Sequence, residues 1–261
     1  MSGHVDVLAS TAIIMVIMVV LVWLISLPVN NTSVADIFWG TGLVVIAWAA
    51  WAIGDGNSDR SNLLVAMVSI WGIRLTAHLW RRGRSSDANH HYQSMRHREG
   101  AGFAAKSLVT VFLLQGTVLW VVSLPVQLAM TASSSSVGVL AVVGASVWGV
   151  GFFFETVGDA QLARFRADPS ADDSVLDWGL WRYTRHPNYF GDFCIWWGIW
   201  LVAADTSDAR FGIVGPLLMS LLLLRLPGLT SLERGLHERR KGYAAYVSRT
   251  SAFIPRPPRT P

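Results

Sequence analysis

Charged side chains and cysteine are scarce in this chain of 261 residues. Asp, Glu, Lys and Arg make up 15% of the sequence, whereas 52% of its side chains are apolar. Because ordinary soluble domains carry about 25% charged residues, the composition argues against a soluble enzyme or binding module. The single cysteine, Cys194, excludes an intramolecular disulfide, and no neighbouring residues are arranged to activate it as a catalytic thiol.

Several common sequence signals are also missing. No Gly-x-Gly-x-x-Gly turn follows a strand pattern, so we expect no Rossmann-type dinucleotide site. The chain has no internal repeat and no long flexible linker. Its first apolar run, Val7–Val29, lacks a preceding Lys or Arg, is long, and is followed by no small-residue cleavage site. We therefore interpret this run as a membrane helix and not as a signal peptide.

The chain instead contains a series of apolar runs, most of which reach the roughly 17–25 residues that a helix needs to cross a bilayer. These runs lie at Val7–Val29, Ile37–Gly54, Leu63–Trp80, Leu108–Met130, Val137–Phe154, Phe193–Ala204 and Phe211–Leu226. Thirteen tryptophans fit aromatic belts at the two membrane interfaces. The sequence predicts an all-α polytopic integral membrane protein with about seven transmembrane helices in a single domain, residues 1–261.

Basic residues gather on one side of this predicted topology. If the N-terminus is external, that side receives the loops 81–106 and 157–187 and the tail 229–261, while the other side keeps only Arg60 and Arg210. The positive-inside rule then predicts a cytoplasmic C-terminus. Anionic lipid headgroups or a cofactor phosphate would account for the net charge of +4, so neither a nucleic acid nor a protein partner is implied.

The segment Trp178–Asp192, directly before the sixth apolar run, concentrates cationic and polar side chains. Pro187 disfavours helical geometry in the residue before it, so we expect the sixth helix to begin within residues 188–192, capped by Asn188 or Asp192. Amides at a helix start attract anions. A phosphorylated or carboxylated ligand is one interpretation, and a helix cap flanked by interfacial side chains is the other. The side chains concerned are Arg182, Arg185, His186, Asn188, Tyr189 and Asp192.

Glu155, Asp159 and Arg166 share one face of the predicted fifth helix. Carboxylates four residues apart repel each other by roughly 0.2–0.5 kcal/mol unless another group lies between them. Ribose hydroxyls, an adenine amine or a carboxamide would fill that place. Arg164 or Arg166, folded back along the helix, would do so as well.

Ionisable side chains also occur close to or within the apolar runs, where each costs about 2.5–3.5 kcal/mol and therefore usually faces a cavity or a partner. Asp36, at the start of the second run, is either a helix N-cap or a group in a membrane-facing cavity. Arg74 and His78 lie four residues apart on the third helix, so we expect their common face to point into the bundle. A structural ion pair with Asp36 is the alternative.

Many of these motifs resemble the steroid 5-alpha-reductase family, and most closely its bacterial branch. The resemblance extends over roughly residues 35–256. Its segments are Asp36–Gly40, Ile70–Leu75, Leu113–Gly116, Ser123–Pro125, Phe154–Asp159, Trp178–Trp181, Asn188–Asp192, Leu232–Glu233, Tyr243–Tyr246 and Ser251–Pro255.

The resemblance implies a seven-helix fold in a bacterial inner membrane that binds NADPH from the cytosolic side. The implied reaction is hydride transfer to the carbon–carbon double bond of a lipophilic enone, such as a 3-oxo-delta-4 steroid. Matching motifs imply that the residues that bind NADPH are Arg74, Arg82, Arg84, Glu155, Asp159, Arg166, Asn188 and Asp192. To this cofactor set we add the polar neighbours His78, Arg182, Arg185, His186, Tyr189 and Glu233. We expect no metal site.

The chain departs from the family pattern in the region that would hold the substrate. It lacks the glutamate near the second helix, and Trp71 occupies the position of the family's ketone-polarising tyrosine. Asp192 replaces a more usual glutamate, and Asn89–Tyr92 replaces an acidic, tyrosine-rich segment. We predict that Asp36 donates a hydrogen bond to the developing enolate oxygen, with Tyr189 and His78 as alternatives.

Two other functions remain as alternatives. Arg185–Gly191 also resembles isoprenylcysteine and phospholipid methyltransferases, which use S-adenosylmethionine. A non-catalytic membrane protein, such as a transporter or a scaffold, is the second alternative. Transporters commonly show repeats and helices broken near the midplane, whereas the polar clusters here gather at one face.

Overall fold

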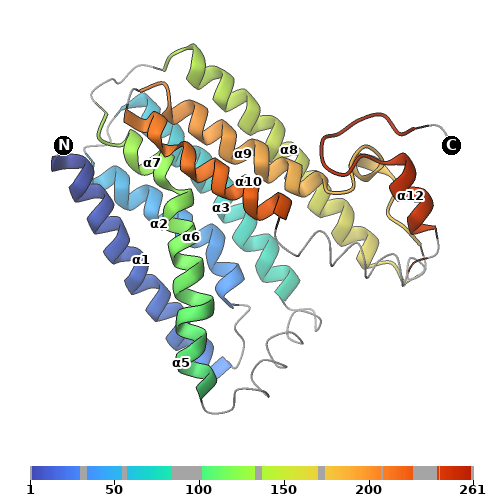
Figure 1. Ribbon diagram of the computed structural model, residues 1–261, viewed down its shortest axis with the longest axis horizontal. Coiled ribbons are helices and arrows are strands. Elements are labelled where there is room, and N and C mark those ends of the chain that lie inside the picture. The colour runs from blue at the N-terminus through green and yellow to red at the C-terminus, as the bar shows by residue number, and fades with distance from the viewer. Residues whose placement is uncertain are drawn as a thin grey trace. The chain divides into compact units, whose positions relative to one another are not determined.

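The computed structural model describes residues 2–29, 34–54, 58–83, 102–132, 137–169, 174–206, 208–225, 240 and 242–259. Within these ranges the regular elements are helices, joined by turns and irregular segments that include an isolated parallel bridge between Thr184 and Ser251 (Figure 1). Helices that are long and apolar enough to cross a membrane occupy Gly3–Pro28, Val34–Ile53, Asp59–Arg82, Phe103–Val122 and Val139–Arg166. The protein is therefore an all-α polytopic membrane protein, as predicted. The sixth and seventh predicted spans correspond to shorter helices, Pro187–Ala203 and Ala209–Leu224.

The chain divides into two compact units. The first contains Met1–Val142 and Ile199–Gly215, and the second contains Val143–Gly198 and Pro216–Pro261. The single domain inferred from the sequence stays a prediction.

The first unit contains α1 (Ser2–Val29), α2 (Val34–Ile53) and α3 (Asp59–Gly83). Helix α2 packs against both α1 and α3. Glycines allow α2 and α3 to meet closely, since a Cβ added to Gly72 would lie 2.7 Å from the carbonyl oxygen of Gly40. Small residues at such contacts are typical of helices that associate within membranes.

The fourth apolar run of this unit is segmented. It forms α5 (Phe103–Ser107), the π-helix η3 (Leu108–Leu113), α6 (Leu114–Val122) and α7 (Leu124–Ala129). The single helix predicted for Leu108–Met130 is therefore wrong beyond Val122. The helix breaks at Ser123 because Pro125, in the first turn of α7, cannot continue the hydrogen-bond ladder of α6. The turn η6 (Asp208–Ile213) packs against α7.

The second unit is built from most of α8 (Val139–Arg166), most of α9 (Pro187–Ala203) and most of α10 (Val214–Arg225). It also contains the 3-10 turn η5 (Gly179–Arg182) and α12 (Tyr243–Arg249). Helices α8 and α9 run antiparallel and touch backbone to backbone. A Cβ added to Gly198 would lie 2.6 Å from the carbonyl oxygen of Gly144, and one added to Gly151 would lie 2.5 Å from that of Gly191. The contact between Gly151 and Gly191 lies near the start of α9.

Candidate functional site

The segment that precedes α9 is bonded to the last turns of α8. Trp181 Nε1 donates a hydrogen bond to the carbonyl oxygen of Gly158 at 3.1 Å, and the Leu180 N–H donates to Gln161 Oε1 at 3.0 Å. Gly179 has a φ of 60°, and a Cβ there would collide with the Gln161 side chain. The positive φ therefore favours glycine at this turn, which leads into α9.

Helix α9 begins at Pro187 and leaves His186 outside the helix. The prediction that Pro187 keeps the preceding residue out of the helix is confirmed. The predicted helix start within residues 188–192 is wrong by one residue. Proline suits the first helical position because the N–H group that it lacks would have no partner there. Asn188 and Asp192 consequently lie inside the helix and do not cap it. His186 is only 6% exposed and stacks on Tyr189, with ring centroids 5.6 Å apart.

A hydrogen bond of 3.1 Å joins Asn188 Nδ2 to Asp159 Oδ1. Asp159 is 6% exposed and Glu155, one turn earlier on α8, is 4% exposed. Gly191 of α9 lies against Glu155, since an added Cβ would come within 2.7 Å of the Glu155 Cβ. A buried carboxylate costs free energy unless its oxygens accept hydrogen bonds, so the Asn188 amide stabilises Asp159 in this position. The structure therefore brings predicted cofactor residues of α8 and α9 together.

The predicted cationic residues of this unit differ in exposure. Arg185 is half-buried, and its backbone N–H donates to the carbonyl oxygen of Ser251 at 2.9 Å. Arg166, at the end of α8, and Arg182, at the end of η5, have exposed side chains. Asp192 is half-buried one turn after Asn188 in α9.

The remaining described candidates belong to the first unit. Gln115 Nε2 donates to Asp36 Oδ1 at 3.4 Å, and Gln115 Oε1 accepts a hydrogen bond of 3.2 Å from Trp39 Nε1. Asp36 is the third residue of α2, so it is not the N-cap that the sequence allowed. Its side chain is exposed in the first turn of the helix.

Helix α3 carries the predicted basic residues of this unit. Arg74 and His78 are half-buried, and Arg82 is exposed in the last turn. Trp71, three residues before Arg74, is fully buried. Arg84 and Glu233 lie outside the described residues. In the described part of the chain, no three His, Cys, Asp or Glu side chains are grouped to hold a metal ion.

Residues 22–250 match the model of a protein family described as "Protein of unknown function (DUF1295)". The chain belongs to this family. It is similar to "Uncharacterized protein C594.04c" of Schizosaccharomyces pombe, with 23% identity over 271 residues that cover 90% of this chain and 75% of the yeast protein. No solved structure matches the chain.

Gln115 was not predicted from the sequence as a partner of Asp36. The signal was present, because a glutamine within the apolar run Leu108–Met130 needs a polar contact. Its position one residue into α6 directs the amide to the first turn of α2.

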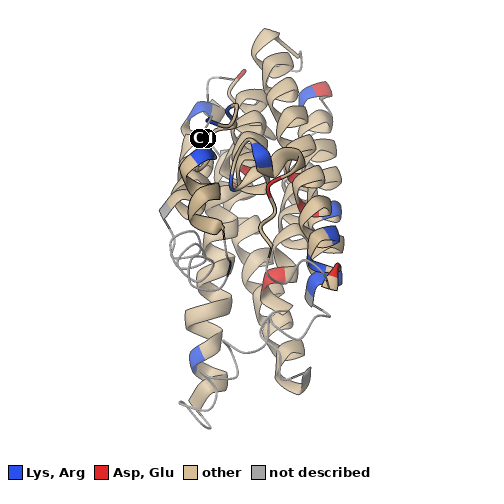
Figure 2. Ribbon diagram, turned by 90° about the vertical axis from the view of Figure 1, so that its right-hand side faces the viewer, with Lys and Arg blue, Asp and Glu red and all other residues tan. Residues whose placement is uncertain are grey.

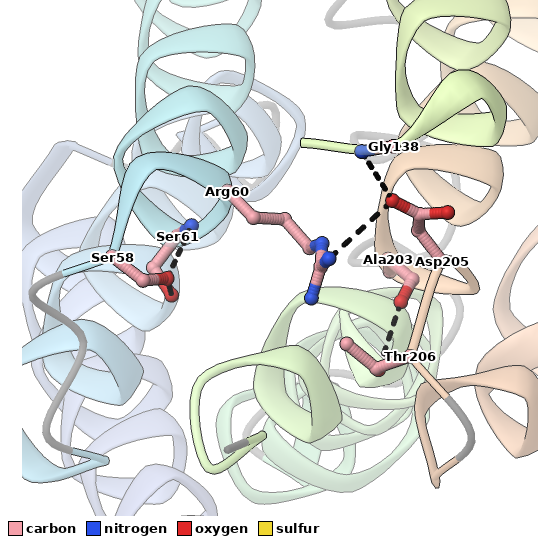
Figure 3. A network of polar contacts seen from close by, with 7 residues as sticks. All are labelled: Ser58, Arg60, Ser61, Gly138, Ala203, Asp205 and Thr206. Carbon is pink, nitrogen blue, oxygen red and sulfur yellow. Dashed lines mark hydrogen bonds and ion pairs between the residues drawn. The ribbon is translucent and has the colours of Figure 1, made fainter. Parts of the chain in front are cut away.

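The sequence also did not indicate a buried ion pair between Arg60 and Asp205 (Figure 3). Arg60 is 2% exposed, and its Nη2 lies 3.3 Å from Asp205 Oδ2. The Gly138 N–H donates to the same oxygen at 2.7 Å. The pair joins the start of α3 to the chain between α9 and η6, so Arg60 has a structural role in addition to its place in the charge asymmetry.

Proposed function

We propose that this protein is an NADPH-dependent membrane reductase that acts on the carbon–carbon double bond of a lipophilic enone, such as a 3-oxo-delta-4 steroid. The observation that carries the proposal is the hydrogen bond between Asp159 and Asn188. It joins two segments that resemble the steroid 5-alpha-reductase family, Phe154–Asp159 and Asn188–Asp192, although they are far apart in the sequence.

The side chains around this bond fit a dinucleotide. The carboxylates of Glu155 and Asp159 would accept hydrogen bonds from ribose hydroxyls or an amine, and the Asn188 amide both donates and accepts. The guanidinium groups of Arg166, Arg182 and Arg185 would offer forked donors to phosphate oxygens. Bound NADPH would supply the hydride, while these residues bind and orient the cofactor.

Reduction of an enone also requires a hydrogen-bond donor at the ketone oxygen, where negative charge develops. We assign this role to Asp36 in its protonated form, with Gln115 holding the carboxyl group in place. Asp36 lies at one end of a candidate membrane span, a position accessible to a lipid-soluble molecule. Because Trp71 replaces the family tyrosine, the proposal specifies the substrate only as a lipophilic enone.

A second candidate is an S-adenosylmethionine-dependent isoprenylcysteine or phospholipid methyltransferase. Two features favour it, the segment Arg185–Gly191 and the buried carboxylates of Glu155 and Asp159, which would attract a cationic methyl donor. The arginines of the same unit favour NADPH instead, since they would bind its phosphates and repel a sulfonium ion.

We place the cofactor site on the cytoplasmic side of a bacterial inner membrane. The support is the sequence itself, in which nearly all basic residues fall on the side of the predicted topology that contains the C-terminus.

Titration of the detergent-purified protein with NADPH, NADH and S-adenosylmethionine separates the candidates. Mass spectrometry and absorbance of the untreated protein first reveal any cofactor retained through purification. The reductase proposal expects NADPH to bind. Binding of S-adenosylmethionine alone would replace it with the methyltransferase, and binding of none of the three would contradict both.

A further inference from the structure

The last helix and the chain that follows it enclose a cavity of about 330 Å³. Its lining is mostly polar and includes three arginines, Arg249, Arg256 and Arg259. Ser248, Thr250 and Ser251 also line it. We call this cavity the arginine pocket. None of the residues assigned above to the cofactor lines it.

Hydrogen bonds hold the walls of the arginine pocket in place, although the chain after α12 is not helical. The Arg256 N–H donates to the carbonyl oxygen of Tyr183 at 3.0 Å, and the Arg259 N–H donates to that of Arg249 at 2.9 Å. Thr184 pairs with Ser251 in the isolated bridge. The backbone that presents the arginines is therefore fixed before any ligand binds, which reduces the entropy lost on binding.

Aromatic contacts anchor the same segment. Phe253 packs edge-on against Phe190 and Phe193 of α9, with ring centroids 6.0 and 5.6 Å apart. The Tyr246 hydroxyl of α12 donates to the carbonyl oxygen of Trp181 at 2.6 Å. These contacts fasten both walls of the pocket to the segment around the start of α9.

Among the described residues, the positive charge of the arginine pocket is only partly compensated. Arg249 forms an ion pair with Asp177. Arg256 and Arg259 are exposed, and no ion pair links either one to an acidic residue within the described ranges. Figure 2 shows basic residues gathered on the ribbon around the C-terminal end. Within the described part of the chain, three guanidinium groups and one carboxylate leave two positive charges that an anion would neutralise.

We propose that the arginine pocket binds a phosphate group, provided either by an anionic lipid headgroup or by a soluble phosphate compound. Guanidinium forks match the geometry of phosphate oxygens and form charge-assisted hydrogen bonds with them. A volume of about 330 Å³ lies at the lower end of the roughly 300–1,000 Å³ of ligand pockets, so a headgroup or a small phosphate compound fits better than an entire dinucleotide.

The test compares Arg256→Gln/Arg259→Gln with a matched control, Arg164→Gln/Arg210→Gln, which removes two exposed arginines elsewhere and the same net charge. Each purified protein is titrated with inorganic pyrophosphate in detergent. Each is also tested for retention of phosphatidylglycerol by native mass spectrometry, with phosphatidylcholine as the neutral lipid. Unchanged circular dichroism and melting temperature verify that each variant is folded.

We expect the wild type to bind at least one of the two anionic probes, and the pocket variant to bind it about tenfold more weakly, while the control stays within about twofold. Selective retention of phosphatidylglycerol would identify a lipid headgroup, and pyrophosphate binding would identify a soluble phosphate. Equal losses in both variants, or no binding by the wild type, would overturn the proposal.

Titration with NADPH separates this pocket from the proposed cofactor site. The pocket variant should bind NADPH as the wild type does, and a parallel loss of NADPH and probe binding would overturn the assignment of a separate site. Failure of the wild type to bind NADPH would contradict the reductase proposal and leave the phosphate result valid.

Discussion

The side-chain amide of Asn188 donates a 3.1 Å hydrogen bond to the carboxylate of Asp159, and so joins the first turn of α9 to α8. The two helices already touch through glycines farther along their contact. The hydrogen bond is therefore the polar end of an otherwise close-packed helix pair, at the place where the chain enters α9.

A double-mutant cycle measures how much the hydrogen bond between Asp159 and Asn188 contributes to stability. We expect Asp159→Ala and Asn188→Ala each to lower the free energy of unfolding, with a coupling of about 0.5–3 kcal/mol between them. Removing either partner abolishes the same hydrogen bond. The double variant should therefore lose less free energy of unfolding than the two single variants lose together. Denaturant titration in detergent, followed by tryptophan fluorescence, provides the values. Strict additivity would show that the bond contributes no stability.

The glycine contact gives a second prediction. A Cβ on Gly191 would lie 2.6 Å from the carbonyl oxygen of Gly151, so Gly191→Ala should force α8 and α9 apart and cost about 1–3 kcal/mol. Gly149→Ala is the matched control on α8, because nothing lies within 4 Å of its added Cβ. Helix propensity alone predicts that this control gains up to about 1 kcal/mol. Similar thermal stabilities for the two variants would contradict the packing described here.

The buried ion pair gives a third prediction. Arg60→Met should cost about 3–5 kcal/mol, because it leaves Asp205 without its cationic partner. The double variant Arg60→Met/Asp205→Leu removes both charges, so it should recover part of that loss. The predicted order of melting temperatures is wild type, then the double variant, then Arg60→Met. A double variant less stable than Arg60→Met would show that the Gly138 contact with Asp205 matters more than the pair.

The proposed hydrogen-bond donor gives a fourth prediction. Asp36→Ala should lower kcat for NADPH-dependent reduction of a 3-oxo-delta-4 steroid such as progesterone by about 10²–10³-fold. The Kd for NADPH should not change. Gln115→Leu should lower kcat less, since it removes only the group that positions Asp36. Unchanged turnover in Asp36→Ala would remove this residue from the mechanism.

The membrane class, the approximate positions of the long helices and the effect of Pro187 on His186 could all be predicted from local sequence patterns. Apolar length determines whether a helix can span a bilayer, and proline acts on its immediate neighbours. The break at Ser123 was also encoded by Pro125, but the apolar run continues past it and conceals the interruption.

Long-range pairings could be predicted only in part. Residues such as Asp159 and Asn188 were identified separately, because each is a polar group next to an apolar run. Their hydrogen bond depends on the packing of α8 against α9, which helical periodicity cannot specify. The same reason explains why Gln115 and Asp205 were not assigned: a polar side chain shows that it needs a partner but does not identify that partner.

NADPH titration of the wild type, Asp159→Ala and Asp168→Ala tests the central claim most directly. Asp168 is an exposed carboxylate just after α8, so its variant removes the same charge and leaves the hydrogen bond between Asp159 and Asn188 in place. The account predicts that the wild type and Asp168→Ala bind NADPH with similar Kd, and that Asp159→Ala binds it at least about tenfold more weakly. Equal affinities for all three proteins, or no binding by the wild type, would contradict it.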